Sequence, residues 1–229
     1  MFSYKTDSQS GNIVIYILIA IALFGILTAV LTRLNEQSGN LSISEEQQAL
    51  YANNLTAFSA SAQNIIDQMV VSGSSLSDIN FINPASAGFD TAPHYHKLYH
   101  PAGGGLNMPA SAPALFTGTA AMPPAGWYIG RFNNVEWTPS SAPDIIVTAY
   151  QIDKAVCEAV NRRITGNTDI PALAGTGDIR TYLIDTDYHG EGNAPLTALI
   201  CAGCENMPSL CVSNGTGTSW AFYSIIGVQ

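Results

Sequence analysis

One uncharged apolar segment, residues 13–31, constrains this chain more than any other part of its sequence. It reads IVIYILIAIALFGILTAVL and contains no charged side chain. At about 1.5 Å per residue, roughly 19 helical residues extend about 28 Å, close to the thickness of a bilayer's hydrocarbon core. The preceding residues, 1–11, are hydrophilic and end in Gly11. The pattern therefore predicts a membrane-spanning helix over residues 12–34, behind a short polar leader.

Three kinds of N-terminal segment combine a polar start with an apolar helix. A secretory signal peptide has a basic start, an apolar core of about 7–15 residues and a small-x-small cleavage site after the core. Here the apolar core is longer, and residues 32–36, TRLNE, contain no such site. An uncut single-span anchor fits the length, and so does a leader that is cut before the apolar helix. The last two alternatives remain open.

The segment SGNIVIYILI, residues 10–19, resembles the N-terminus of type IV pilins and type II secretion pseudopilins. The resemblance implies that a prepilin peptidase cuts after Gly11, so that Asn12 becomes the mature N-terminus. It also implies a filament-core role for residues 12–34, with membrane lipid and other pilin-like subunits, identical or different, as partners. The protein would then be a single-pass protein of the bacterial inner membrane, with residues 35–229 in the periplasm or outside the cell.

The chain departs from the pilin pattern at two positions. Asn12 stands where the family usually has phenylalanine or methionine, and Tyr16 stands where the fifth mature residue is usually glutamate. In the family, that glutamate is thought to neutralise the N-terminal amine of a neighbouring subunit. A tyrosine hydroxyl can hydrogen-bond an amine but cannot cancel its charge. We therefore expect a minor or heteromeric subunit that assembles with a partner carrying the carboxylate.

Composition limits the classes of partner. The chain has 229 residues and a formal net charge of −9. Without the leader and apolar segment, roughly 195 residues remain, which is enough for one domain with a hydrophobic core. Binding to a nucleic-acid backbone requires clustered lysine and arginine side chains. The only adjacent basic pair is Arg162-Arg163, which we interpret as a solvated helix end, so we expect no nucleic-acid partner.

Apolar periodicity predicts an α+β head domain. Spacings of three and four residues predict an amphipathic helix over about 44–72, with the apolar stripe Tyr51, Leu55, Phe58, Ala62, Ile65 and Met69. Its N-terminus offers two possible capping boxes, Ser42 with Glu45 or Ser44 with Gln47. A second helix is expected over 152–164, and strands at 126–130, 135–137, 144–150, 210–212 and 220–226. This order favours an α+β fold with a largely antiparallel sheet. The resemblance to pilins implies that one long N-terminal helix, with a membrane half and an amphipathic half, packs on that sheet.

The four cysteines are Cys157, Cys201, Cys204 and Cys211. In an exported domain they are expected to form two disulfides, and four cysteines allow three connectivities. We predict Cys204 with Cys211, which closes a short loop around Pro208, and therefore Cys157 with Cys201. The Cys201-x-x-Cys204 spacing also occurs in redox and zinc sites, but a zinc site needs a second pair at similar spacing.

Three other patterns have weak chemical signals. His94, His96 and His100 form a tight group, but their flanks are typical of a loop and favour turn packing over metal binding. Asp185 and Asp187 lie in an acidic run that lacks the register of a calcium loop. The triplet at 103–105, GGG, is either a tight surface turn or a place where backbones approach closely. No catalytic motif is legible, so we expect no enzyme, cofactor or metal.

Taken together, the sequence favours a structural subunit of pilin-like or pseudopilin-like type, anchored in the inner membrane and assembling through its N-terminal helix. The alternative is a monomeric single-span protein whose periplasmic head binds a ligand or partner. Processing at Gly11 and side-by-side self-association are the properties that distinguish these two hypotheses.

Overall fold

The computed structural model describes residues 15–26, 28, 43–119, 123–184 and 194–229. The chain divides into two compact units, Met1–Ser42 and Ile43–Gln229. In the first unit, residues 15–26 and 28 are helical. The large apolar side chains of residues 15–26 are strongly solvent-exposed, with exposed fractions of 50% to 69%. The described part of the first unit is therefore a short apolar helix that presents its side chains to the surroundings.

This short helix corrects two predictions from the sequence. Residues 15–26 at about 1.5 Å per residue extend only about 18 Å, whereas a bilayer core is about 30 Å thick. Among the residues that the structure describes, no helix combines the length and the apolar character needed to cross a membrane. The prediction of one long N-terminal helix is wrong, and so is the single-pass inner-membrane location that depended on residues 12–34. The predicted leader and the Gly11–Asn12 cleavage site lie outside the described residues.

The second unit, Ile43–Gln229, is the head domain. It is built on a four-stranded sheet in which every neighbouring pair of strands is antiparallel. The spatial order is β1-β2-β4-β3. The strands are β1 (Gly126–Asn133), β2 (Asp144–Tyr150), β3 (Ser209–Ser213) and β4 (Trp220–Gly227). The α+β class with an antiparallel sheet therefore agrees with the sequence pattern. The strand expected at 135–137 is absent, and Val135 forms only an isolated bridge to Leu196.

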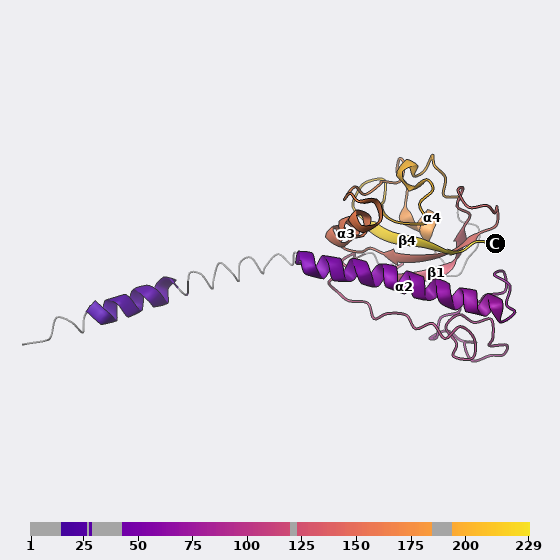
Figure 1. The fold of residues 1–229 in the computed structure, drawn as a ribbon, viewed down its shortest axis with the longest axis horizontal. Coiled ribbons are helices and arrows are strands. Elements are labelled where there is room, and N and C mark those ends of the chain that lie inside the picture. The colour runs from indigo at the N-terminus through magenta and orange to yellow at the C-terminus, as the bar shows by residue number, and fades with distance from the viewer. Residues whose placement is uncertain (1–14, 27, 29–42, 120–122, 185–193) are drawn as a thin grey trace, which may run out of the picture. The chain divides into compact units, whose positions relative to one another are not determined.

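Helices cover both faces of this sheet (Figure 1). One face is covered by α2 (Glu45–Val71) and α3 (Lys154–Thr165), which also contact each other. The opposite face is covered by α4 (Ile179–Leu183) and the chain around η1 (Ala202–Cys204). Because both faces are covered, every residue of the central strand β2 is buried. Alternate β2 residues pack in opposite directions, Ala149 toward α2 and α3 and Ile146 toward α4.

Helix α2 begins with a complete capping box. The Ser44 hydroxyl accepts the Gln47 backbone N–H, and the Gln47 side chain accepts the Ser44 N–H in return. Two backbone donors that the first helical turn leaves open are thereby satisfied. The buried stripe consists of Ala52, Leu55, Ser59, Ala62, Ile66 and Met69. It lies where the spacing of apolar residues predicts it, although Tyr51, Phe58 and Ile65 are only half-buried.

The long segment between α2 and β1 is ordered by a buried lysine. Lys97 is only 6% exposed, and its ammonium donates hydrogen bonds to the carbonyls of Gly88 (2.8 Å), Phe89 (2.6 Å) and Thr91. A Cβ atom on Gly103 would lie 2.3 Å from the Lys97 carbonyl oxygen. The structure supports both interpretations of the glycine triplet, because residues 101–104 also form a turn in which the Gly103 N–H donates to the His100 carbonyl at 2.8 Å.

Asp144 is a fully buried carboxylate at the start of β2. Its Oδ2 atom accepts hydrogen bonds from the Val135 N–H and the Thr138 hydroxyl, both at 3.0 Å, and Oδ1 has no hydrogen-bond partner among the described residues. Burial raises the pKa of Asp144 above its ordinary value, and the two hydrogen bonds offset this only in part. The folded state therefore favours the protonated carboxyl, whose stabilising contribution is lost as the pH rises through the raised pKa.

We therefore expect Asp144→Asn to stabilise the protein at neutral pH. The amide oxygen keeps the acceptor role, and the new N–H₂ group can donate to Asn133 Oδ1, a buried acceptor without a partner at the paired position on β1. The gain should be about 1 kcal/mol in the free energy of unfolding at neutral pH. It should shrink as the pH falls through the raised pKa of Asp144 and be largely gone at about pH 4, near the ordinary aspartate pKa. Urea denaturation at both pH values measures it. A variant that is less stable by the same amount at both pH values would contradict this account of the buried charge.

Candidate functional site

The structure pairs the four cysteines differently from the sequence-based prediction. Cys157 is bonded to Cys211, with Cα atoms 5.4 Å apart, and Cys201 is bonded to Cys204, with Cα atoms 5.3 Å apart. The predicted pairs Cys204–Cys211 and Cys157–Cys201 are wrong because these residues belong to opposite faces of the sheet. Cys211 packs with α2 and α3, whereas Cys201 and Cys204 pack around α4. Neither disulfide is exposed, which fits a structural role.

The three histidines do not converge on a common point. The rings of His94 and His100 stack with centroids 4.1 Å apart, while His96 Nδ1 lies 2.8 Å from the Ser74 hydroxyl. His100 Nδ1 accepts the Ala102 N–H, and its Nε2 atom lies 3.7 Å from Asp90 Oδ1. Within the described ranges, no group of three His, Cys, Asp or Glu side chains is arranged to hold a metal ion.

The acidic run that contains Asp185 and Asp187 lies outside the described residues. The calcium-loop hypothesis for that run therefore stays untested.

Two pockets among the described residues, at one end of the sheet, form the candidate site.

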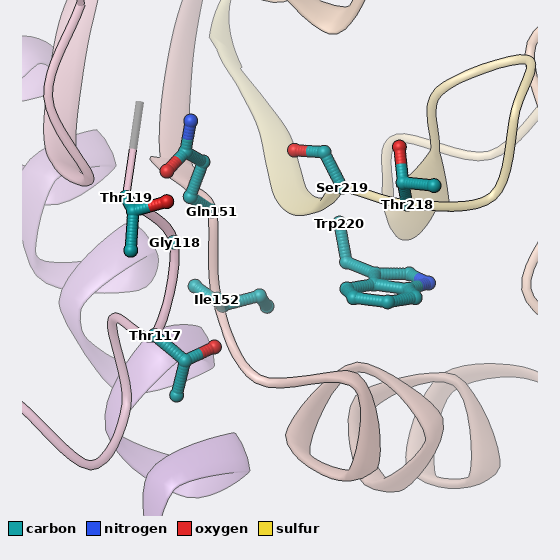
Figure 2. A pocket seen from close by; sticks show the side chains of 8 residues that line it. All are labelled: Thr117, Gly118, Thr119, Gln151, Ile152, Thr218, Ser219 and Trp220. Atoms are coloured by element: carbon teal, nitrogen blue, oxygen red, sulfur yellow. The ribbon is translucent and has the colours of Figure 1, made fainter. Parts of the chain in front are cut away.

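The first pocket forms where β2 ends and β4 begins. The antiparallel pairing of Tyr150 with Ala221 places these two strand ends side by side. Gln151 and Ile152 leave β2 there, and the segment 218–220 leads into β4. A third segment, 117–119, is held in place because the N–H groups of Thr117 and Gly118 both donate to the Gln151 carbonyl, at 3.1 and 3.2 Å. Together these segments enclose a pocket of about 460 Å³ (Figure 2).

The pocket wall is closely fitted around Gln151. This residue is 6% exposed and has a φ of 58°, a left-handed backbone conformation that side-chain-bearing residues rarely adopt. A Cβ atom on Gly118 would lie 1.8 Å from Gln151 Oε1, so only glycine leaves room for the amide. Trp220 lies on the other side of the pocket, half-buried against the apolar cluster that contains Ile152 and Val156 (Figure 2).

A second pocket of about 240 Å³ adjoins the first and shares Ser219 with it. Its other lining residues are Tyr150, Thr176, Gly177, Asp178, Arg180, Asn214 and Thr216. Asn214 fixes the shared wall, because its Oδ1 atom accepts the N–H groups of Thr218 (2.8 Å) and Ser219 (3.1 Å). The Ser219 hydroxyl is buried and has no hydrogen-bond partner in the described structure. We call these two pockets together the polar groove.

One ion pair lies in the polar groove. The Arg180 guanidinium donates to Asp178 Oδ2, with its Nε atom at 2.8 Å. Partial burial acts to raise the pKa of Asp178, but hydrogen bonds from the Arg180 side chain and backbone outweigh it and lower the pKa below its ordinary range. Asp178 is therefore ionised at neutral pH and balances the charge of Arg180. The rest of the lining is uncharged and consists of hydroxyls, amides, aromatic rings, two glycines and Ile152.

Sequence reasoning did not find the polar groove. Its residues come from separate loops, and no spacing rule connects Gly118 with Gln151 or Ser219. The one available signal was the turn at 214–217, NGTG, with Trp220 three residues after it. Searches of protein-family models, curated proteins and solved structures found no match to this chain.

Proposed function

We propose that the protein is a structural subunit of pilin-like or pseudopilin-like type, which associates with other such subunits through its N-terminal apolar segment. The observation that carries this proposal is the exposure of the apolar helix at residues 15–26. Nine large apolar side chains there, from Ile15 to Ile26, are exposed by 50% to 69%. Burying apolar surface is favourable by about 25 cal/mol per Å², and soluble proteins rarely leave so continuous an apolar surface uncovered. Packing against the same segment of neighbouring subunits would cover it.

The head domain supports the same proposal. A helix packed on an antiparallel sheet, with α3 tied to β3 by the Cys157–Cys211 disulfide, forms a compact unit of its own, distinct from the unit that contains the apolar segment. Two internal disulfides cross-link this domain, which suits a subunit that keeps its shape in an assembly. Tyr16 in place of an acidic residue favours assembly with a different subunit that carries the carboxylate.

The processing step gives a direct test of this proposal. Prepilin peptidase should remove residues 1–11, so the mature chain from the native host should begin at Asn12. Gly11→Val should block cleavage, because the enzyme's cut follows this glycine, and should leave a precursor about eleven residues longer. Gly25→Val is the matched control: a Cβ atom at Gly25 has no neighbour within 4 Å, and the leader is unchanged. N-terminal sequencing and intact mass measure both variants. A mature wild-type chain that still begins at Met1 would refute the prepilin-type proposal.

A further inference from the structure

We infer that the polar groove is a binding site for a neutral saccharide. This site is separate from the assembly function, because it lies in the head domain and uses no residue of the apolar segment. The first pocket, about 460 Å³, falls within the range of about 300–1,000 Å³ that small-molecule sites occupy. The second pocket extends it by about 240 Å³ across Ser219, which gives room for more than one sugar unit.

The lining matches the mixed surface of a sugar ring. A saccharide presents a C–H face and a rim of hydroxyls that both donate and accept hydrogen bonds. Trp220 offers an apolar ring on one side of the first pocket (Figure 2). Thr117 and Thr119 offer exposed hydroxyls that can act as donor or acceptor.

Ser219 is the residue that most clearly indicates a missing ligand group. Its hydroxyl is buried and lacks a hydrogen-bond partner within the described part of the chain, and the residue lines both pockets. A buried hydroxyl without a partner costs free energy, so such groups are rare in native structures. Rotation of the Ser219 side chain would bring this hydroxyl to a sugar hydroxyl in the groove and would break no contact that holds the loop, because Asn214 binds the Ser219 backbone N–H and not its hydroxyl.

Charge favours a neutral ligand over an anionic one. Arg180 is the cationic side chain that lines the groove, and Asp178 balances it through an ion pair. A phosphate or sulfate would have to compete with this carboxylate for the guanidinium. The fixed backbone of Gln151 and the absence of a side chain at Gly118 also mean that the site is shaped before a ligand arrives. Such preorganisation lowers the entropic cost of binding.

The test is binding of the full-length protein to an array of neutral, sialylated and sulfated oligosaccharides, followed by calorimetry with the best neutral saccharide. Trp220→Ala should weaken that binding about tenfold or more, through loss of the stacking face. Ser219→Ala should weaken it several-fold while leaving the fold intact, because only an unpartnered hydroxyl is removed. Trp220→Phe keeps an aromatic face and should recover part of the affinity.

Trp137→Ala is the matched control. Trp137 is also a half-buried tryptophan, but it lies outside both pockets and its indole N–H donates to the Met207 carbonyl. This variant should lose stability without losing saccharide affinity. The inference is overturned if no neutral saccharide binds at millimolar concentration, if binding is confined to the anionic saccharides, or if Ser219→Ala and Trp220→Ala bind as tightly as the wild type.

Discussion

Removing the Cys157–Cys211 disulfide is expected to destabilise the head domain by about 4 kcal/mol. The bond joins residues 54 positions apart, and the loop-entropy relation gives about this value for a loop of that length. The bond also ties α3 to the edge strand β3, which reinforces a packed contact between the helix and the sheet. A loss of this size is a large fraction of the 5–15 kcal/mol that stabilises a typical domain.

The Cys201–Cys204 disulfide provides an internal comparison. Its residues are only 3 positions apart, for which the same relation gives about 2 kcal/mol. All four cysteines are fully buried, so replacing either pair with alanine leaves cavities of similar size. Urea denaturation of Cys157→Ala/Cys211→Ala and of Cys201→Ala/Cys204→Ala should therefore show the larger loss in the first variant. An equal or larger loss in the second would show that loop length does not control these effects.

A charge in the apolar helix is expected to abolish association between subunits. Leu18 is 61% exposed, so Leu18→Asp leaves the fold of the isolated chain undisturbed. In a packed apolar interface, the same carboxylate would be buried without a partner, at a cost of several kcal/mol. We expect the associated fraction, measured by sedimentation velocity, to fall at least about tenfold.

Leu199→Asp is the matched control for this variant. Leu199 lies in the head domain and is 89% exposed, so the substitution makes the same chemical change on a surface outside the apolar segment. It should sediment like the wild type. If both variants lose association to the same degree, net charge rather than the apolar helix controls it, and the assembly proposal fails.

Short-range patterns in the sequence correctly predicted helix α2 and strand β2 of the head domain. The spacing of Leu55, Ala62 and Met69 predicts α2, and the run Asp144–Tyr150 predicts β2, because each pattern reflects a single element and its buried side. The Ser44–Gln47 box was one of two candidates, since both spacings are equally legible before the structure fixes which serine precedes the helix.

The sequence alone did not predict correctly how residues far apart in the chain pair with one another. The disulfide prediction used loop length around Pro208, whereas the side of the sheet decides the pairing: Cys211 points to one face, and Cys201 and Cys204 lie on the other. The N-terminal prediction treated residues 13–31 as a single span, but the described helix covers residues 15–26 and 28.

The polar groove is the clearest case of a site that depends on tertiary structure. Gly118, Gln151 and Ser219 each look like ordinary loop residues, and only strand pairing at the end of β2 brings them together. Lys97 is similar, because a lone lysine in sequence suggests a solvated surface, whereas its three carbonyl partners exist only after the loop has folded.

Photo-crosslinking from position 18 in the native host tests the assembly claim most directly. A photoreactive phenylalanine analogue replaces Leu18 in one strain and Leu199 in another, both exposed positions, and mass spectrometry identifies the cross-linked chains. The account predicts that position 18 cross-links to another copy of this chain or to a second pilin-like subunit, and that position 199 does so far less. Cross-links from position 18 that reach no pilin-like chain, or equal yields from both positions, would contradict it.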